Sequence, residues 1–420
     1  MNQTPACDAY AAPAEGGATS CRFCGGPLAP VVDLGMSPLC ESFLRADQLD
    51  RMEPFYPLKV CVCERCFLMQ LRQYVDPGEI FGEYAYFSSF SDAYLDHARA
   101  YVETAVRRLG LGAASRVVEL ASNDGYLLQH FVARGIPALG VEPAANVARA
   151  AVAKGVPTLV EFFSAAVAAR MDKADLVIAN NVLAQVPDLN GFVAGMAALL
   201  KPSGVASVEF PHLMRLIEGN QYDTIYHEHF SYFSLGTAAR IFAAHGLAVF
   251  DVEEIWTHGG SLRLWLCPVG AGRTPGARVA SILAAERDAG LDRMAGFERF
   301  AGSVRSARWN LLDFLIRAKW YGKSIAGYGA PGKGNTLLNY CGIRSDILDY
   351  TVDRNPYKHG RFLPGTHIPV FPPEHIDETR PDYVLILPWN LKHEIMAQLA
   401  HIRDWGGQFV VPIPDVAVFS

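Results

Sequence analysis

The 420-residue sequence lacks three features that would direct it to a membrane or a nucleic acid. It has no run of about 20 uninterrupted apolar residues, the length that spans a bilayer. Residues 1–20 have no charged start followed by an apolar core, so no secretory signal is predicted. The formal net charge of −6 shows no basic excess for general binding to nucleic acid or anionic lipid. We therefore expect a cytoplasmic protein, either a monomer or a small homo-oligomer, without nucleic-acid or membrane partners.

Charged residues are few, at 19%, while half of the residues are apolar, an ordinary globular composition. Because 420 residues exceed what one core organises, two or three units are expected. Short apolar runs alternate with helical segments in two series, separated by a charged helical stretch at about 278–320. Such alternation predicts parallel sheets covered by helices on both faces. The predicted fold class is α/β, with an N-terminal module (1–75, of which 1–20 form a loose tail), a central doubly wound domain (76–272) and a smaller Rossmann-like α/β domain (273–420).

Cysteines are concentrated at one end of the chain, where two CxxC pairs stand about 40 residues apart. In a large chain without a secretory signal, clustered thiols bind metal more often than they form disulfides. Four sulfurs complete a tetrahedral Zn²⁺ site and leave no open position, so a structural zinc is predicted. Cys40 or Cys61 could replace one ligand, and unrelated core or redox thiols are the alternative. The predicted ligands are Cys21, Cys24, Cys63 and Cys66.

A cofactor site is predicted where the first strand of the central series ends. Residues 117–120 form an apolar strand that runs into the turn 121–125 and then a helix, and doubly wound sheets bind ligands at such strand ends. The turn lacks the G-x-G-x-x-G spacing of a dinucleotide site. Glu119 suits the amino acid part of S-adenosylmethionine (SAM), Glu142 its ribose hydroxyls, and Gly125 allows a close approach. Another nucleotide is the alternative ligand. The predicted SAM-binding residues are Glu119, Ala121, Asn123, Gly125, Glu142, Asn180 and Asn181.

Acid–base side chains are dense in the segment 222–233, which reads YDTIYHEHFSYF. Moving a methyl group to carbon requires a base for the proton next to a carbonyl and a donor for the developing enolate oxygen. Tyr226, Glu228 and His229 are candidates for these roles. His227 points elsewhere if the segment is extended, because side chains alternate along a strand. A polar loop satisfied by its own hydrogen bonds is the alternative interpretation.

The glycines at 327–334 follow a predicted strand and open a predicted helix. Backbone amides there, with Lys333, favour phosphate binding. Asp353 ends the next strand. Anchoring of a nucleotide-sugar diphosphate is the preferred interpretation, and a dehydrogenase dinucleotide site and a packing role are the alternatives.

Motifs along nearly the whole chain resemble those of the sugar C-methyltransferase family. They are CRFC with CERC, YAYFSS, ELASNDGYLL, YHEHFSYFS, THGGSLR, GYGAPGKGNTLLNY and VDRNPYKHGRFLPGTHIPV. The resemblance implies a zinc-binding N-terminal domain, a central class I SAM-methyltransferase domain and a Rossmann-like C-terminal domain. It implies a dTDP-linked 4-keto-6-deoxy sugar methylated at carbon 3. The implied catalytic residues are Tyr84 or Tyr86, Tyr226, Glu228 and His229, and the predicted substrate-binding residues are Gln185, His258, Lys333, Asn335 and Asp353.

One position departs from the family pattern. Where the family motif N-V-L-x-H-x-P-D carries a histidine, this chain has Gln185, which cannot shuttle a proton at neutral pH. The role of base then falls on His229 or Tyr226. Methylation of oxygen or nitrogen is therefore kept as an alternative, and so is a zinc- and SAM-binding module without catalytic activity.

Overall fold

The structure is a computed structural model that describes residues 20–81, 88–90 and 92–420, and its strands form three sheets. The first is a four-stranded antiparallel sheet in the order β1-β2-β3-β9. Its strands are β1 (Leu28–Ser37), β2 (Tyr56–Cys63), β3 (Met69–Leu71) and β9 (Ser231–Tyr232). The fourth strand comes from the middle of the chain, so the polar segment 222–233 joins the sheet of the cysteine module.

The central sheet has seven strands in the order β10-β11-β8-β7-β4-β5-β6. Its strands are β4 (Val117–Leu120), β5 (Ala138–Val141), β6 (Thr158–Leu159), β7 (Ala174–Asn180), β8 (Leu200–Pro211), β10 (Leu247–Ile255) and β11 (Ser261–Pro268). Strands β4 to β8 pair in parallel, whereas β10 and β11 form an antiparallel hairpin on β8. The chain order reverses on either side of β4, which places the topological switch point at its carboxyl end.

Helices cover both faces of the central sheet because successive β4 side chains are buried on opposite sides. Val118 packs into a core shared with α6 and α8, while Val117 packs into a second core shared with α2. The helices of this unit are α2 (Asp92–Leu109), α3 (Gln129–Val132), α4 (Ala145–Ala153), α5 (Ala165–Ala168), α6 (Leu189–Leu199), α7 (Leu213–Glu218) and α8 (Leu235–Ala244). The predicted doubly wound architecture is confirmed. Among the helices that the structure describes, none is both long and apolar enough to cross a bilayer.

The C-terminal unit is a six-stranded sheet in the order β14-β13-β12-β15-β16-β17, parallel except for β17. Its strands are β12 (Ile325–Tyr328), β13 (Tyr350–Val352), β14 (Val370–Phe371), β15 (Tyr383–Ile386), β16 (Gln408–Val411) and β17 (Ala417–Phe419), and its helices are α12 (Gly332–Cys341), α13 (His375–Thr379) and α14 (Lys392–Gln398). The α/β alternation predicted for this region is therefore present, with two short edge strands added.

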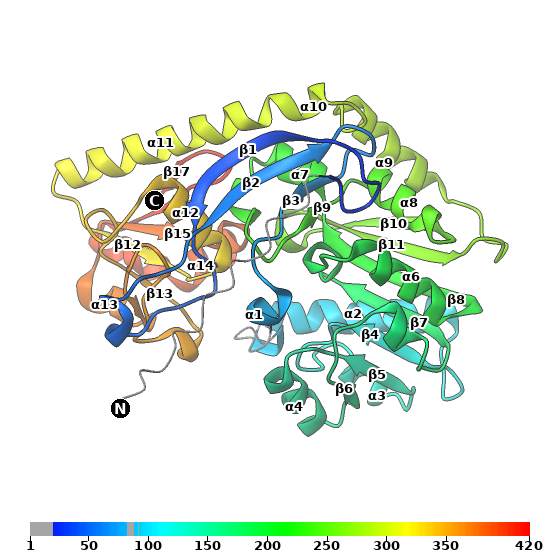
Figure 1. Cartoon of the computed structure of the whole chain (residues 1–420). Helices are drawn as coiled ribbons and strands as arrows, with labels where there is room; N and C mark the ends of the chain where they lie inside the picture. Colours follow the sequence, from blue (N-terminus) through cyan, green and yellow to red (C-terminus); the bar gives the residue numbers. More distant parts are fainter. Residues whose placement is uncertain (1–19, 82–87, 91) are drawn as a thin grey trace, which may run out of the picture.

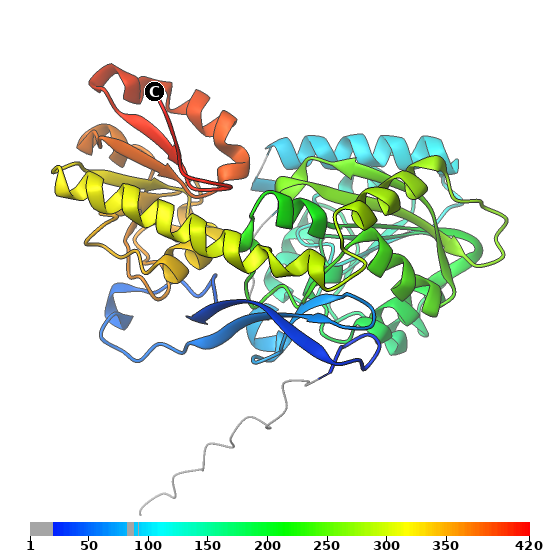
Figure 2. The ribbon, with the colours of Figure 1, turned by 90° about the horizontal axis from the view of Figure 1, so that it is seen from above.

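Two structures connect the central and C-terminal sheets. The charged stretch forms α9 (Ala277–Asp288), α10 (Ala295–Glu298) and α11 (Phe300–Trp320), and α11 runs along the outside from one unit to the other (Figures 1 and 2). The β1–β2 pair extends along both units, as Figure 2 shows. Residues of β1, β2, α11 and α12 share one hydrophobic core. The cysteine module is therefore packed against the C-terminal unit as well as the central one.

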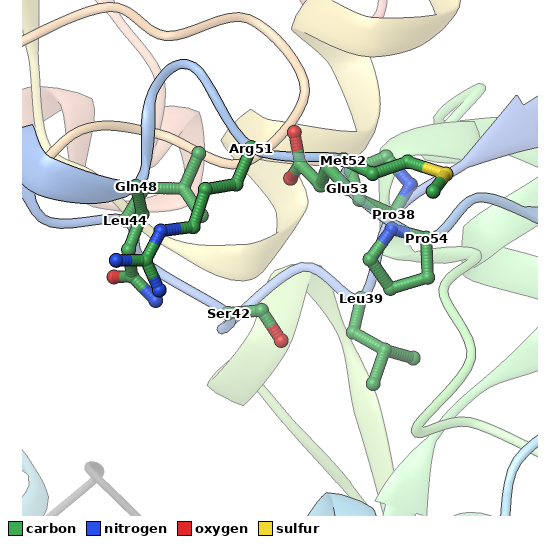
Figure 3. A pocket seen from close by; sticks show the side chains of 9 residues that line it. All are labelled: Pro38, Leu39, Ser42, Leu44, Gln48, Arg51, Met52, Glu53 and Pro54. Atoms are coloured by element: carbon green, nitrogen blue, oxygen red, sulfur yellow. The ribbon is translucent and has the colours of Figure 1, made fainter. Parts of the chain in front are cut away.

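The loop between β1 and β2 reaches the C-terminal unit. Leu44 forms a bridge with Phe362, and the Glu53 carboxylate accepts the Gly365 amide at 2.8 Å. The loop surrounds a small pocket lined by Pro38, Leu39, Ser42, Leu44, Gln48, Arg51, Met52, Glu53 and Pro54 (Figure 3). Cys40 and Glu41 lie in this loop and are thereby carried to the start of α12.

Candidate functional site

The four predicted metal ligands converge on one point. Their sulfurs all lie within 4.8 Å of one another. The Sγ atoms of Cys21 and Cys66 are 3.5 Å apart, as are those of Cys24 and Cys63. Zinc–sulfur bonds of about 2.3 Å in a tetrahedron require sulfurs roughly 3.8 Å apart, so these thiols fit a structural Zn²⁺. Cys40 and Cys61 are outside this group.

Hydrogen-bond donors to the cysteine sulfurs are also present. The Gln70 side chain donates to Cys21 Sγ at 3.2 Å, and the Arg65 amide donates to Cys63 Sγ at 3.4 Å. Amide donors of this kind stabilise thiolates and orient them toward a metal. The module therefore has both the ligands and the supporting donors of a zinc site.

The predicted SAM site lies at the switch point, where the backbone is unusually shaped. Ala121, Asn123 and Asn181 have φ values of 56°, 49° and 56°, a left-handed conformation that is costly for residues other than glycine. Gly125 has φ of 74°, and a Cβ there would approach Val156 to 3.0 Å. Strained turns of this type bring backbone groups and side chains close to a ligand.

Several buried polar atoms at these strand ends have no hydrogen-bond partner within the protein. They are Glu119 Oε2, Ser122 Oγ, Asp124 Oδ1, Asn180 Oδ1 and Asn181 Oδ1. Buried polar groups are nearly always paired, so a group of unpaired acceptors indicates a bound ligand with donors. SAM presents an ammonium group and ribose hydroxyls, and these acceptors fit it.

Glu119 and Glu142 differ in their environments. Glu119 is 1% exposed, and burial together with the Glu142 charge raises its pKa well above the ordinary value. A cationic amino group would offset this cost. Glu142 accepts the amides of Asn123 and Ala144, both at 2.9 Å. Each of its oxygens keeps a lone pair for a hydroxyl donor.

Asn181 connects this site to helix α2, because its side-chain amide donates to Tyr94 Oη at 2.7 Å. Tyr94 in turn stacks on Tyr126, with ring centroids 5.4 Å apart. Tyr84 and Tyr86, the alternative aromatic catalytic residues, lie outside the described residues, and their role stays a prediction.

His229 and Tyr226 lie together in the polar segment, with ring centroids 4.1 Å apart. His229 Nδ1 is 3.0 Å from the Thr224 carbonyl oxygen. Since a carbonyl oxygen only accepts, Nδ1 carries the hydrogen and Nε2 is the ring's proton acceptor. Burial lowers the pKa of His229 to about 4, so the imidazole is neutral over the physiological range. The neutral ring leaves the Nε2 lone pair available to accept a proton, while the lowered pKa makes it a weaker base than a free imidazole.

The surroundings of Glu228 differ from those of His229. Its Oε1 lies 3.5 Å from Cys40 Sγ, and burial, with the nearby Glu41 carboxylate, raises its pKa to about 8. His227 contacts the Pro57 carbonyl oxygen at 3.2 Å. The two histidines of the segment have separate surroundings because residues 227–228 form a turn, in which the His229 amide donates to the Tyr226 carbonyl oxygen at 2.9 Å; the segment is not extended there, so strand alternation does not apply. With a pKa of about 8, Glu228 carries a proton at neutral pH.

His258 belongs to the η5 turn (Thr257–Gly259) before β11, in a left-handed conformation with φ of 55°. Its Nε2 is buried without a hydrogen-bond partner in the protein. Burial, followed by the nearby charge of Lys333, lowers its pKa to about 3. His229, His258 and Lys333 come from distant parts of the sequence, and the structure places them near one another.

Gln185 ends the η3 turn (Leu183–Gln185), and its neighbour Ala184 accepts the Phe230 amide at 2.7 Å. The turn therefore packs directly against the polar segment. The substrate-binding role of Gln185 stays a prediction.

The remaining C-terminal candidates make hydrogen bonds within the protein, although Asn335 Oδ1 is buried without a partner there. The Asn335 side chain donates to the Cys40 carbonyl oxygen at 2.6 Å. Asp353 accepts the amides of Ala330 and Asn355 at 2.7 and 2.8 Å. Their predicted contacts with substrate are not tested by these bonds, which show a local structural role for both side chains.

Sequence analysis missed a buried charge network beside the SAM site. Arg263 Nε donates to Glu209 Oε1 at 2.5 Å, and His97 Nε2 lies 3.4 Å from Glu209 Oε2. The pKa of Glu209 stays below its usual value because His97 and Arg263 offset the effect of burial. A glutamate near the end of β8 was the available signal, but its partners come from α2 and β11, which no local motif connects.

Comparison with known proteins identifies each part of the chain. Family models match residues 21–81 (zinc binding domain), 94–252 (methyltransferase domain) and 256–414 (C-methyltransferase C-terminal domain). The C-methyltransferase NovU of Streptomyces niveus is 38% identical over 405 residues, which cover 95% of this chain and 96% of NovU. Two solved methyltransferase structures are similar to part of this chain. They are the SAM-bound magnesium protoporphyrin IX methyltransferase ChlM of Synechocystis (TM-score 0.32, 15% identity, 45% of this chain and 88% of that one) and a SAM-dependent methyltransferase of Clostridium acetobutylicum (TM-score 0.34, 9% identity, 42% and 92%).

Proposed function

The chain belongs to the C-methyltransferase family that includes NovU and is a SAM-dependent methyltransferase, and from this premise we propose that it methylates carbon 3 of a dTDP-linked 4-keto-6-deoxy sugar. The observation that supports the proposal best is the orientation and the neutral charge of the His229 ring. Its Nδ1 hydrogen is held by Thr224, its ring is neutral, and Tyr226 lies against it. A methyltransferase acting on carbon next to a ketone needs such a base, because the carbon becomes nucleophilic only after losing a proton.

In the proposed reaction His229 Nε2 removes the proton from carbon 3 of the sugar. The electron pair of the broken C–H bond moves into the C3–C4 bond, and negative charge develops on the ketone oxygen. Tyr226 is the nearby hydroxyl that can donate to the substrate. When bound, SAM would supply an electrophilic methyl group; its transfer to carbon 3 would break the sulfur–methyl bond and leave that bond's electron pair on the sulfur of S-adenosylhomocysteine. His229 keeps its orientation throughout because the Thr224 carbonyl holds Nδ1–H.

The strand ends of the central sheet are proposed to hold the cofactor. Glu119 faces its ammonium group, Glu142 its ribose hydroxyls, and Asn180 and Asn181 the region between the cofactor and the sugar. The unpaired acceptors at these positions support the assignment. The remaining members, Ala121, Asn123 and Gly125, shape the turn through their positive φ values.

Zinc is proposed to act structurally through Cys21, Cys24, Cys63 and Cys66. The module that it stabilises contributes β3 to the sheet that holds β9, directly after His229. It also carries Cys40 to Glu228. The zinc site therefore supports the geometry of the polar segment without contacting substrate.

Hydrogen exchange at carbon 3 in deuterium oxide, without SAM, tests the proposal. The wild type is expected to exchange this hydrogen, and His229→Ala to slow exchange by about 100- to 10,000-fold, the usual range for loss of a general base. Tyr226→Phe should slow it less. His401→Ala is a matched control, because His401 is a partly exposed histidine paired with Asp377 in the C-terminal unit. Unchanged exchange in both His229→Ala and Tyr226→Phe, with S-adenosylhomocysteine still bound, would reject these roles.

Methylation of oxygen or nitrogen is the second candidate, and Gln185 is the feature that favours it. An enzyme that transfers the methyl group to a hydroxyl or amine would not catalyse exchange at carbon 3. Exchange by the wild type therefore separates the two candidates before any product is characterised.

A further inference from the structure

Lys333 lies in surroundings that differ from those of a phosphate-binding lysine at a helix start. Its Nζ donates to Asn390 Oδ1 at 2.9 Å and lies 5.0 Å from the centre of the Trp389 ring. Both partners follow β15, so the ammonium is held on the side of the C-terminal sheet that faces the central unit's polar segment.

Trp389 connects Lys333 to both catalytic elements of the central unit. Its indole Nε1 donates to Asp223 at 2.7 Å, and Asp223 lies within the polar segment 222–233. A Cβ on Gly259 would come within 2.6 Å of the Trp389 ring, so the η5 turn that carries His258 also touches it. The ammonium therefore lies over a ring that contacts the segment of His229 on one side and the turn of His258 on the other.

The charge of Lys333 acts on both imidazoles. After burial, Lys333 is the next charge that lowers the pKa of His258, and it also lowers the pKa of His229. Asp223 raises the pKa of Lys333 while burial lowers it. Asp223 is the carboxylate near Lys333, yet its Oδ2 accepts the Trp389 indole hydrogen, and no carboxylate lies within ion-pair distance of Lys333 among the described residues.

The start of α12, in contrast, is occupied by the chain itself. The Glu41 carboxylate lies there, with Oε1 placed 3.1 Å from where a Cβ of Gly332 would be. Lys358 pairs with Glu41 at 3.7 Å and donates to the Ala330 carbonyl oxygen at 2.7 Å. A diphosphate at this turn would have to displace a carboxylate of its own charge.

We propose that the Lys333 ammonium hydrogen-bonds to the C4 ketone oxygen of the substrate and stabilises the negative charge that forms there when His229 removes the carbon 3 proton. This inference rests on the proposed function and assigns the enolate-stabilising group within it. The proton passes to His229, and the electron pair of the C–H bond passes to the C3–C4 bond and then to the new carbon–carbon bond. The sulfur–methyl bond would break with its electron pair on the sulfur of S-adenosylhomocysteine, and Lys333 keeps its proton throughout. A fixed cation beside a developing oxyanion is a strong form of transition-state stabilisation.

The experiment measures two quantities on Lys333→Met, namely carbon 3 exchange at saturating keto sugar and the Kd of thymidine diphosphate. Exchange is expected to fall about 100- to 1,000-fold, the range for loss of one oxyanion donor, while the Kd changes less than about twofold. Lys333→Arg should recover part of the exchange, because the charge is retained. Lys323→Met is the matched control, since Lys323 is a largely exposed lysine of the same unit, paired with Asp382.

Two results would overturn the assignment. A tenfold or larger rise in the Kd of thymidine diphosphate, with exchange at saturation unchanged, would make Lys333 a diphosphate ligand. Equal loss of exchange and of S-adenosylhomocysteine binding in both Lys333 variants would indicate a folding role. The proposed function is tested on the wild type alone. It is wrong if the wild-type protein neither exchanges the carbon 3 hydrogen nor methylates carbon.

The pH dependence of carbon 3 exchange tests the role of Lys333 independently. Lys333 must be charged to act, so exchange should fall as pH rises through its pKa, which burial lowers. Asp223→Asn removes the carboxylate that raises this pKa and should move the alkaline fall to lower pH, with the indole hydrogen bond retained by the amide oxygen. An alkaline fall at the same pH in Asp223→Asn and wild type would contradict the role.

Discussion

The central and C-terminal sheets share one local arrangement. In each sheet a carboxylate at the end of the second strand accepts a backbone hydrogen bond from the turn that follows the first strand. Glu142 accepts two backbone amides in the central sheet, and Asp353 accepts two in the C-terminal sheet. Around Glu142 several buried acceptors have no protein partner, whereas the start of α12 is occupied by Glu41 and Lys358. We propose that the same strand–turn–helix pattern forms a ligand site in the central sheet, whereas in the C-terminal sheet a carboxylate of the chain itself lies at the turn and only Asn335 Oδ1, among the described residues of α12, is buried without a partner.

The largest expected effect comes from removing zinc, because zinc holds the module that closes the C-terminal turn. Cys63→Ser should abolish zinc binding and lower stability severely, since structural zinc contributes roughly 10 kcal/mol or more in small zinc domains. Zinc content and thermal unfolding measure this. Cys61→Ser is the control, because Cys61 lies on the same strand but outside the sulfur cluster. Retention of zinc by Cys63→Ser with loss in Cys61→Ser would reverse the ligand assignment.

A smaller effect distinguishes the role of the strand-end acid in the central sheet from its role in the C-terminal sheet. Glu119→Ala should weaken S-adenosylhomocysteine binding by roughly 10- to 100-fold, because a charge-assisted hydrogen bond contributes about 1.5–3 kcal/mol. Asp353→Asn should leave that affinity unchanged and lower the free energy of unfolding by about 1 kcal/mol through its weakened bonds to the turn. Isothermal titration and urea unfolding measure these quantities. If Asp353→Asn weakened cofactor binding as much as Glu119→Ala, the contrast between the sheets would be wrong.

The smallest effect concerns the contact that closes the C-terminal turn. Glu41→Gln removes a negative charge from the start of α12 and from Lys358. We expect the free energy of unfolding to fall by about 1 kcal/mol, the usual value for a charge at a helix terminus. Asp47→Asn, an exposed acid of the same loop paired with Arg45, should change it little. Equal stability of Glu41→Gln and wild type would show that Glu41 does not hold the turn.

The features that sequence predicts here depend on short-range spacing. The zinc cysteines, the family, the SAM fold and the two α/β series follow from CxxC pairs and from apolar runs with helices between them, and all are confirmed. The strand-end acids follow from the position of each acid relative to its strand. Their individual roles, and the domain boundaries at 75 and 272, stay predictions.

The features that sequence does not predict depend on contacts between distant segments. Strand β9 is two residues long and joins the zinc module's sheet through β3, where the nearest pairing joins Gln70 to Ser231, 161 residues later in the chain. Cys40 reaches Glu228 across 188 positions. The predicted phosphate-binding turn looks open in the sequence because Glu41 enters it only through tertiary packing.

The destination of the methyl group is the most direct measurement of the central claim. Wild-type protein is incubated with SAM that carries a ¹³C-labelled methyl group and with a dTDP-linked 4-keto-6-deoxy sugar, and the product is analysed by NMR. The account predicts that the labelled methyl carbon is bonded to carbon 3 of the sugar. A labelled methyl group bonded to oxygen or nitrogen would contradict it.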